Sequence, residues 1–498
     1  SGSGSGSGSG TTTNGNGTTW QVADIYNGGN DYAGEEMSVL IGDTIYFDAM
    51  STGNSGLELW AHDTSNASTW KVIDSYSGSS SSDPGRFMEI VVGDTLYFSA
   101  RDGSSGHELW AHDTSNTSTW QVADINSGSS SSNPGYSMDV ILVGDTIYFD
   151  ANDGNSGIEV WAHDTSNAST WRVADIRSGS IGSNPGWNMD VILVGDTLYF
   201  DAIDGSSGRE LWAHDTSNAS TWQVADICSG SSSSDPGVGG MEILVGDTIY
   251  FVADDGSSGY ELWAHDTSNA STWQAADIRS GSGSSTPGVN MAILVGDTIY
   301  FDADDGSSGY ELWAHDTSNA STWQVADIHS VSSSSPGTTM AILAGDTLYF
   351  SARDGSSGHE LWAHDTSNTS TWQVAEIRSG SPSSNPGNNM EILVGDTIYF
   401  DADDGSTGIE LWAHDTSNAS TWQVADIRSS SMSGINGASP GQNMVILVGD
   451  TLYFDALLDG ADRELWAHQP GEITHLEAAQ AAAQTLEPTT ATEPHGWS

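Results

Sequence analysis

Residues 301–328 read FDADDGSSGYELWAHDTSNASTWQVADI, and close copies of this stretch follow one another along almost the whole chain. The tryptophan of the Glu-Leu-Trp motif recurs at intervals of 49 to 54 residues. These tryptophans are Trp60, Trp110, Trp161, Trp212, Trp263, Trp313, Trp362, Trp412 and Trp466. Repeats of about 50 residues are typical of propellers and solenoids, in which each unit buries its hydrophobic faces against its neighbours.

Each repeat contains four short runs with the composition of β-strands. Around the quoted stretch they are MAILVG, TIYFDA, YELWAHD and TWQVADI, at residues 291–296, 298–303, 310–316 and 322–328. The runs are rich in β-branched and aromatic residues, and Gly, Asp, Asn or Ser bounds each of them. No helical periodicity competes, and a polar link at residues 279–288 leads from one repeat to the next. This pattern predicts an all-β fold in which each repeat is a four-stranded propeller blade.

The chain begins and ends in the middle of a repeat. NGTTWQVADI at residues 16–25 corresponds to a fourth strand, and RELWAH at residues 463–468 corresponds to a third. Joining them completes one blade and leaves no open edge, whereas a linear solenoid would need polar caps. We therefore predict a single closed β-propeller over residues 16–468, with nine blades of about 50 residues, closed by the N-terminal strand. An open spiral of the same sheets is the alternative.

The ends differ from the repeats. Residues 1–15 have the composition of a flexible Gly/Ser/Thr linker. Residues 469–498 predict a tail with a short helix near 475–486, because Thr474 and Glu477 have the spacing of a capping box. We expect the chain to be a segment of a longer protein with neighbouring domains.

The chain is strongly acidic. Its 498 residues include 67 acidic and 11 basic ones, for a net charge of −56. Such a surface repels nucleic acids and anionic membranes, whereas it attracts cations or keeps the protein soluble in salt. No apolar run is long enough to span a bilayer, and the single cysteine, Cys228, excludes an intramolecular disulfide.

The repeated phrase resembles the bacterial and archaeal repeat family named for its ELWxxDGT motif. The resemblance covers residues 20–468 and rests on ELWAHD, TWxVADI, LYFxA and DGxxG, although this chain carries Asp-Thr-Ser where the family often has Asp-Gly-Thr. It implies a propeller fold and a secreted or surface-attached protein. It implies no particular reaction, and we expect an extracellular or cell-surface location.

Two repeated groups could carry chemistry. Glu311, Trp313 and His315 alternate along one strand and share a face, so the Glu and His could act as acid and base or could simply support inter-blade packing. Because an enzyme needs one special place rather than nine equal ones, we predict packing and no catalytic residues. Asp302, Asp304 and Asp305 could bind calcium, the only cofactor considered, or could cap a glycine-containing turn.

A sequon of the form Asn-x-Ser/Thr occurs once per repeat, in the turn between the third and fourth strands. Surface glycosylation is one interpretation, and turn formation by Asn and Ser is the other. The sequons begin at Asn16, Asn66, Asn116, Asn167, Asn218, Asn269, Asn319, Asn368 and Asn418.

Strand alternation places the sequons on one face of the ring. The turns between the second and third strands lie on the other face, together with the inter-blade links, and this second face carries the variable residues. Arg and aromatic residues are typical interface anchors, although neutral drift at exposed turns would also produce variation. The predicted partner-binding residues are Phe87, His107, Tyr136, Trp187, Arg209, Tyr260, Tyr310, His359 and Arg378. Acidic residues begin five of the nine inner strands and could line a channel mouth: Glu89, Asp139, Asp190, Glu242 and Glu391.

We therefore predict a non-catalytic extracellular scaffold or adhesion module that binds a protein or glycan surface ligand, with no nucleic acid and no membrane span. One alternative is a carbohydrate-active enzyme, a lyase or hydrolase, with its site in the central funnel. The other is a structural subunit of a surface layer or filament.

Overall fold

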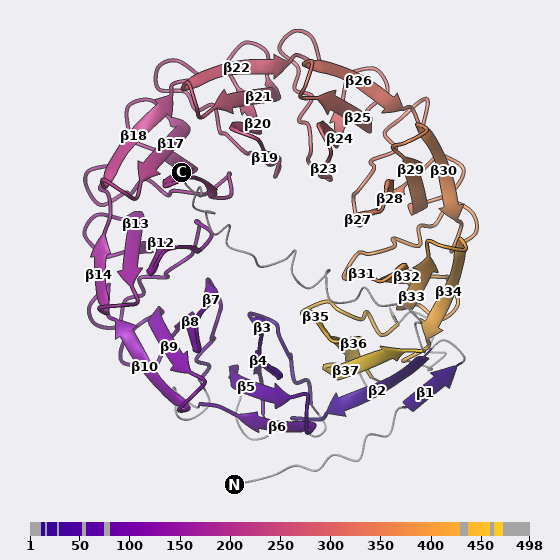
Figure 1. Ribbon diagram of the computed structural model, residues 1–498, viewed down its shortest axis with the longest axis horizontal. Helices are drawn as coiled ribbons and strands as arrows, with labels where there is room; N and C mark the ends of the chain where they lie inside the picture. The colour runs from indigo at the N-terminus through magenta and orange to yellow at the C-terminus, as the bar shows by residue number, and fades with distance from the viewer. Residues whose placement is uncertain are drawn as a thin grey trace, which may run out of the picture.

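The computed structural model describes residues 11–14, 17–26, 29–51, 56–73, 80–428, 437–458 and 463–471. Within these ranges the chain is all-β, and its nine antiparallel sheets stand side by side around a ring (Figure 1). Eight sheets have four strands and the ninth has five. The predicted nine-bladed β-propeller is therefore confirmed. We number the blades 1 to 9 in the order of their inner strands, from β3 to β35.

Each blade has an inner, a second, a third and an outer strand, paired in that order. The inner strands are β3 (Ser38–Ile41), β7 (Glu89–Val92), β11 (Ile141–Val143), β15 (Ile192–Val194), β19 (Glu242–Val245), β23 (Ala292–Val295), β27 (Ala341–Ala344), β31 (Glu391–Val394) and β35 (Val445–Val448). The second strands are β4 (Thr44–Ala49), β8 (Thr95–Ala100), β12 (Thr146–Asn152), β16 (Thr197–Ile203), β20 (Thr248–Asp254), β24 (Thr298–Asp304), β28 (Thr347–Ala352), β32 (Thr397–Asp403) and β36 (Thr451–Leu457). The third strands are β5 (Glu58–Asp63), β9 (Glu108–Asp113), β13 (Ile158–Asp164), β17 (Arg209–Asp215), β21 (Tyr260–Asp266), β25 (Tyr310–Asp316), β29 (Glu360–Asp365), β33 (Ile409–Asp415) and β37 (Arg463–Pro470). The outer strands are β6 (Ser68–Lys71), β10 (Ser118–Ala123), β14 (Ser169–Arg172), β18 (Ser220–Ala225), β22 (Ser271–Ala276), β26 (Ser321–Ala326), β30 (Ser370–Ala375), β34 (Ser420–Ala425) and β2 (Gly17–Ala23).

The turn between the third and outer strands explains why its sequence hardly varies. In blade 6 the Asp316 carboxylate accepts hydrogen bonds from the backbone N–H of Ser318 (2.9 Å) and from the side-chain amide of Asn319 (2.5 Å). Ala320 follows in the left-handed region, with φ of 57°. The side chains of Asp316 and Asn319 therefore stabilise a tight hairpin, as Asp and Asn commonly do in Asx turns.

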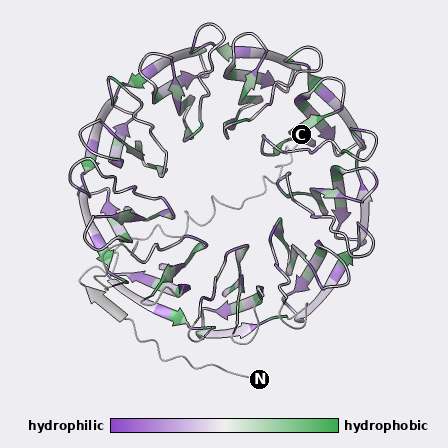
Figure 2. Ribbon diagram, turned by 180° about the vertical axis from the view of Figure 1, so that it is seen from behind, coloured by the Kyte–Doolittle hydropathy of each residue, from purple (hydrophilic) through white to green (hydrophobic). Residues whose placement is uncertain are grey.

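Hydrophobic packing joins neighbouring blades. Figure 2, a view from behind, shows hydrophobic and hydrophilic residues recurring at the same places in successive blades. At the joint between blades 5 and 6, Tyr250 and Leu262 of one blade pack with Phe301 of the next, which is fully buried. Burial of one such Phe stabilises the fold by about 1.5–3 kcal/mol. The Tyr250 ring also contacts the ring of His315, with centroids 5.3 Å apart, and an equivalent Tyr–His pair occurs at each of the nine joints.

The N-terminal strand completes the last blade, as predicted. β2 pairs with β37 in antiparallel register, and Thr19 Oγ1 lies 2.8 Å from His468 Nδ1. On the other side of this blade, the Tyr453 ring packs against His62 of blade 1 at 5.7 Å. Segments near the two ends of the chain thus form one sheet and one joint, which favours the closed ring over the open spiral.

The segment before the propeller is partly structured. Thr11–Asn14, within the expected linker of residues 1–15, forms β1, which pairs with the outer edge of β2 as a fifth strand. Residues 1–10 and 15–16 lie outside the described residues, as does the predicted helix near 475–486.

Candidate functional site

The two faces of the ring carry different connections. Turns between the inner and second strands lie beside those between the third and outer strands, since the Thr317 N–H donates to the carbonyl of Asp297 (2.8 Å). We call this the turn face. The opposite face carries the turns between second and third strands together with the links, and we call it the link face. On this face the backbone N–H of Ser285, in one link, donates to the carbonyl of Tyr260 in blade 5 (3.0 Å). The Ser285 carbonyl accepts from the N–H of Asp304 in blade 6 (3.0 Å).

The repeated glutamate anchors each link. In blade 5 the Glu261 carboxylate accepts hydrogen bonds from the N–H and Oγ–H of Ser285 (3.0 and 2.6 Å) and from the N–H of Ile278 (2.8 Å). Burial raises the pKa of Glu261 despite these donors. The repeated histidine is held separately, with His265 Nδ1 2.8 Å from Thr272 Oγ1 of the outer strand. Glu and His thus have structural partners of their own, which agrees with the packing interpretation.

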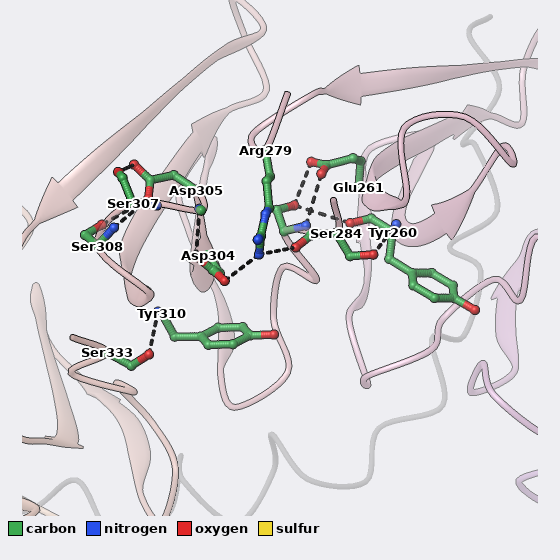
Figure 3. A network of polar contacts seen from close by, with 12 residues as sticks. Tyr260, Glu261, Arg279, Ser284, Asp304, Asp305, Ser307, Ser308, Tyr310 and Ser333 are labelled. Atoms are coloured by element: carbon green, nitrogen blue, oxygen red, sulfur yellow. Dashed lines mark hydrogen bonds and ion pairs between the residues drawn. The ribbon is translucent and has the colours of Figure 1, made fainter. Parts of the chain in front are cut away.

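The three carboxylates of the predicted calcium loop lie in different environments. Asp302 is fully buried and accepts from the N–H groups of Asn290 and Met291 (2.9 and 3.1 Å), which holds the start of the inner strand. Asp304 forms an ion pair with Arg279 at 2.7 Å, as Figure 3 shows.

Asp305 has a third environment. It accepts from the N–H groups of Ser307 and Ser308 (2.8 and 2.9 Å) in an Asx-type turn. Each of Asp302, Asp304 and Asp305 thus has different partners, and among the described residues the three do not form a cluster of metal ligands. These contacts fit the interpretation that the aspartates cap a turn.

Two of the predicted partner-binding residues are buried. Arg209 is 5% exposed, and its guanidinium pairs with the buried carboxylate of Asp201 and donates to the Asn184 carbonyl (2.9 Å). His107 is 7% exposed, and burial lowers its pKa to about 4. These two predictions are therefore corrected: both side chains belong to the interior of the link face and are not exposed anchors.

Four more of the predicted residues are half-buried, and two of them, Tyr260 and Arg378, have side-chain partners within the fold. The Tyr260 hydroxyl donates to Asp235 (3.0 Å), and burial followed by this hydrogen bond raises the pKa of Tyr260 to about 12. Arg378 pairs with Asp403 of the next blade. Tyr310 and His359 are also half-buried, and Figure 3 shows Tyr260 and Tyr310 from successive blades on either side of Arg279.

The remaining three form a continuous aromatic surface. The ring of Phe87 lies 5.5 Å from that of Tyr136, which lies 6.2 Å from that of Trp187. Phe87 is half-buried, whereas Tyr136 is 47% and Trp187 53% exposed. These residues precede the inner strands of blades 2, 3 and 4, so three consecutive blades contribute to one patch. We call these three residues the aromatic arc.

Acidic residues stand at the start of the inner strands of blades 2 to 5 or two residues before it. The backbone N–H of Asp190 donates to Glu242 of blade 5 (3.3 Å), so Glu242 reaches back to the preceding blade. Burial, followed by the charge of Asp190, raises the pKa of Asp139 to about 6 and that of Glu242 to about 8. Burial alone raises the pKa of Glu89 to about 7.

The sequons lie where they were predicted. The described ones occupy exposed turns of the turn face. The side-chain amide of Asn269, for example, donates to Asp266 (2.6 Å), while its Oδ1 accepts from the N–H of Ser271 (3.0 Å). Asn16 lies outside the described residues.

Two features were missed at the level of sequence. Seven outer strands expose a Trp by 39–40%, and these side chains form a belt around the rim: Trp70, Trp120, Trp171, Trp222, Trp273, Trp323 and Trp372. Asp24, Asp31 and Glu464 also bring carboxylate oxygens within 4.8 Å of one another where the two chain ends join. The sequence did contain a signal for this acidic cluster, because Asp31 stands where most links have a Ser two residues before Pro-Gly.

No protein-family model and no curated protein matches the chain. Puromycin hydrolase resembles it in fold, with 12% identity and a TM-score of 0.37 over 74% of this chain and 57% of that protein. BamB from Moraxella catarrhalis has 14% identity and a TM-score of 0.38 over 78% and 96% of the two chains. Oligopeptidase B from Leishmania major has 11% identity and a TM-score of 0.39 over 75% and 53%. The chain spans little more than half the length of puromycin hydrolase and oligopeptidase B, and likenesses this weak carry no argument about function. In the described part of the chain, no helix could cross a membrane.

Proposed function

We propose that this propeller is a non-catalytic binding module of an extracellular or cell-surface protein, which holds a protein or glycan partner on its link face. The observation that supports it is the aromatic arc. The ring is built from near-identical repeats, yet Tyr136 and Trp187 are large and exposed, and their rings lie next to each other in one patch. Exposed aromatic clusters of this kind are typical of interaction sites.

The buried groups support a binding role over a catalytic one. The repeated Glu and His that could serve as acid and base hold links and outer strands instead, as Glu261 and His265 do in blade 5. Incubation with polysaccharides and peptides, followed by chromatography of the products, tests this directly. We expect no cleavage, and released fragments would favour the hydrolase or lyase alternative.

The binding role is tested with a matched pair of variants. Tyr136→Ala/Trp187→Ala removes the exposed members of the arc, and Trp120→Ala/Trp171→Ala removes two rim tryptophans of similar exposure. Both proteins and the wild type are screened against surface-protein and glycan arrays. We expect the arc variant to lose at least tenfold in affinity for the detected partners and the rim variant to keep it, because contacts at an interface centre carry most of the binding energy.

The rim favours a second candidate, a structural subunit of a surface layer. Seven tryptophans exposed on the outer strands of blades 1 to 7 offer apolar contacts along most of the rim. Electron microscopy and sedimentation of the purified ring test for assembly. If sheets or filaments form and the Trp120→Ala/Trp171→Ala variant stays dispersed, the rim is the functional surface; a dispersed wild type removes this candidate.

We also propose N-glycosylation of the exposed sequons on the turn face. In the Asn269 turn, one N–H of the side-chain amide donates to Asp266. A side-chain amide has two N–H groups, so the second N–H is the one that a glycan would replace. Mass spectrometry of native material tests this, and a mass equal to the bare sequence would contradict it.

A further inference from the structure

The link face is asymmetric around the ring at the position that forms the aromatic arc. The two residues before the inner-strand methionine are Arg86-Phe87, Tyr136-Ser137 and Trp187-Asn188 in blades 2 to 4. The same pair is Gly239-Gly240, Val289-Asn290, Thr338-Thr339, Asn388-Asn389 and Gln442-Asn443 in blades 5 to 9, and Glu35-Glu36 in blade 1. At this position, large aromatic side chains are therefore confined to one third of the ring.

Acidic residues at the start of the inner strands, or just before it, are concentrated in the same part of the ring. Four consecutive blades, 2 to 5, carry Glu89, Asp139, Asp190 and Glu242 at this place, whereas among the other five blades only blade 8 carries an acid, Glu391. The charged groups that act on Asp139 and Glu242 are other carboxyls, Asp190 in both cases. Asp139 and Asp190 each stand three residues after an exposed member of the aromatic arc, Tyr136 and Trp187. The charge of Asp190 adds to burial in raising the pKa of Asp139 and Glu242, and a bound cation would relieve this repulsion.

A guanidinium already occupies one end of this surface. The Arg86 guanidinium carbon lies 5.6 Å from the centre of the Phe87 ring, and its Nη1 lies 3.5 Å from Glu36 and 3.8 Å from Asp83. The side chain of Arg86 is itself 46% exposed. An aromatic ring and two carboxylates thus hold an arginine at this end of the surface, as in a cation–π contact at an exposed site.

We propose that the aromatic arc and the carboxyls of blades 2 to 5 form a docking surface for a basic segment of a partner protein, whose Arg or Lys side chains lie on Tyr136 and Trp187. This proposal rests on the binding role given above and names the chemistry of the partner. A net charge of −56 steers such a segment toward the ring, and the arc gives it a place to bind. Rings tilted by 62° and 45° to one another offer no flat platform for a sugar chain, which favours protein over glycan.

Fluorescence anisotropy with a labelled peptide of eight arginines tests the proposal. Measurements at 0.5 M NaCl screen the general attraction of the acidic surface, so that close contacts dominate. We expect Tyr136→Ala/Trp187→Ala to weaken binding about tenfold or more, and Trp120→Ala/Trp171→Ala to change it by less than twofold. Asp139→Asn/Asp190→Asn should weaken it similarly to the arc variant. Thermal unfolding confirms that all variants are folded.

Three further probes separate the alternatives. A peptide of eight glutamates should not bind, a peptide of eight lysines should bind more weakly than the arginine peptide, and cellohexaose and chitohexaose should not compete with it. Equal losses in the arc and rim variants, no loss in either, or competition by a hexasaccharide would overturn the proposal. If array partners depend on the arc while the arginine peptide does not, this proposal fails and the binding role stands; if no partner depends on the arc, both fail.

Discussion

The joint at which the ring closes differs from the joints inside the repeat array, although the same glutamate stands at each. At seven internal joints this glutamate accepts a hydrogen bond from a Ser hydroxyl of the link. At the joint between blades 8 and 9 the Ser is replaced by Ala438, whose N–H donates to Glu410 (3.0 Å). At the closing joint the place is taken by Asp31, which hydrogen-bonds Glu464 carboxyl to carboxyl.

The comparison shows how closure is made from two chain ends. Asp31 has taken over part of the glutamate's task, since it accepts from the N–H groups of Ile25 and Tyr26 (2.9 and 2.6 Å). Burial is the main cause that raises its pKa to about 6. A Ser–Glu joint contains one buried carboxyl whose pKa is raised, as in Glu261, whereas the closing joint contains a second titrating carboxyl in Asp31. Variants of both kinds of joint test this difference, from the largest expected effect to the smallest.

Removal of the closing strand should have the largest effect. A chain that begins after Ala23 lacks β1 and β2, so blade 9 loses its outer strand and β37 gains an open edge. We expect a loss on the order of 5 kcal/mol or more in unfolding free energy, comparable with the net stability of a domain, measured by chemical denaturation. The control is a chain that begins at Thr11 and keeps both strands. Equal stability of the two would show that closure contributes little.

Loss of the glutamate at an internal joint should come next. Glu311→Ala removes the carboxylate that accepts from the N–H of Ile328 and from the N–H and hydroxyl of Ser334, which we expect to cost about 3 kcal/mol. Asp302→Ser is the matched control, because blades 2 and 7 use Ser99 and Ser351 at that place. It should cost about 1 kcal/mol or less. A larger cost for the control would contradict the assignment of the glutamate as the anchor.

Exchange of the link residue between the two kinds of joint should have a smaller, pH-dependent effect. Burial raises the pKa of Asp31 in the folded state to about 6, from its ordinary value of 3.8. Its contribution to stability is therefore present below about pH 4 and is lost as the pH rises through 6. Asp31→Ser should stabilise the ring by about 1–2 kcal/mol at pH 8, and hardly at pH 4, because Ser donates to the glutamate without adding charge.

The reciprocal variant Ser285→Asp should import the same pH dependence into an internal joint. Thermal unfolding of both variants and the wild type between pH 4 and pH 8 measures the effect. A gain from Asp31→Ser that stays constant with pH would argue against the titration of Asp31 as its cause.

Restoration of the missing hydroxyl should have the smallest effect. Ala438→Ser would place Oγ against Glu410, as in the seven Ser-containing joints, and Ala438 is fully buried. We expect a gain of up to about 1 kcal/mol, the net value of one hydrogen bond, measured by denaturation. Ala413→Ser is the control, because Ala413 is buried in a strand and not opposite a link glutamate. This variant should destabilise the fold.

Much of the candidate site followed from the pattern, and part of it did not. Strand alternation placed the variable residues on one face, and Tyr136 and Trp187 are exposed there. Arg209 belongs to the same variable set but lies buried on Asp201, because an Asp on the adjacent strand neutralises it. Likewise, the spacing of Asp302 and Asp304 suggested metal ligands in the sequence. In the structure Asp302 is buried near the end of β24, and Asp304 is paired with Arg279 of a link.

By itself, the sequence determined the all-β class, the nine blades and the closure by the N-terminal strand, because strand period, turn chemistry and repeat phase are local properties that each copy states again. Only the tertiary structure decided which variable side chains reach solvent, and that Asp31 meets Glu464. Exposure and pairing depend on what the neighbouring blade places opposite a residue, and residues 31 and 464 become neighbours only when the ring closes.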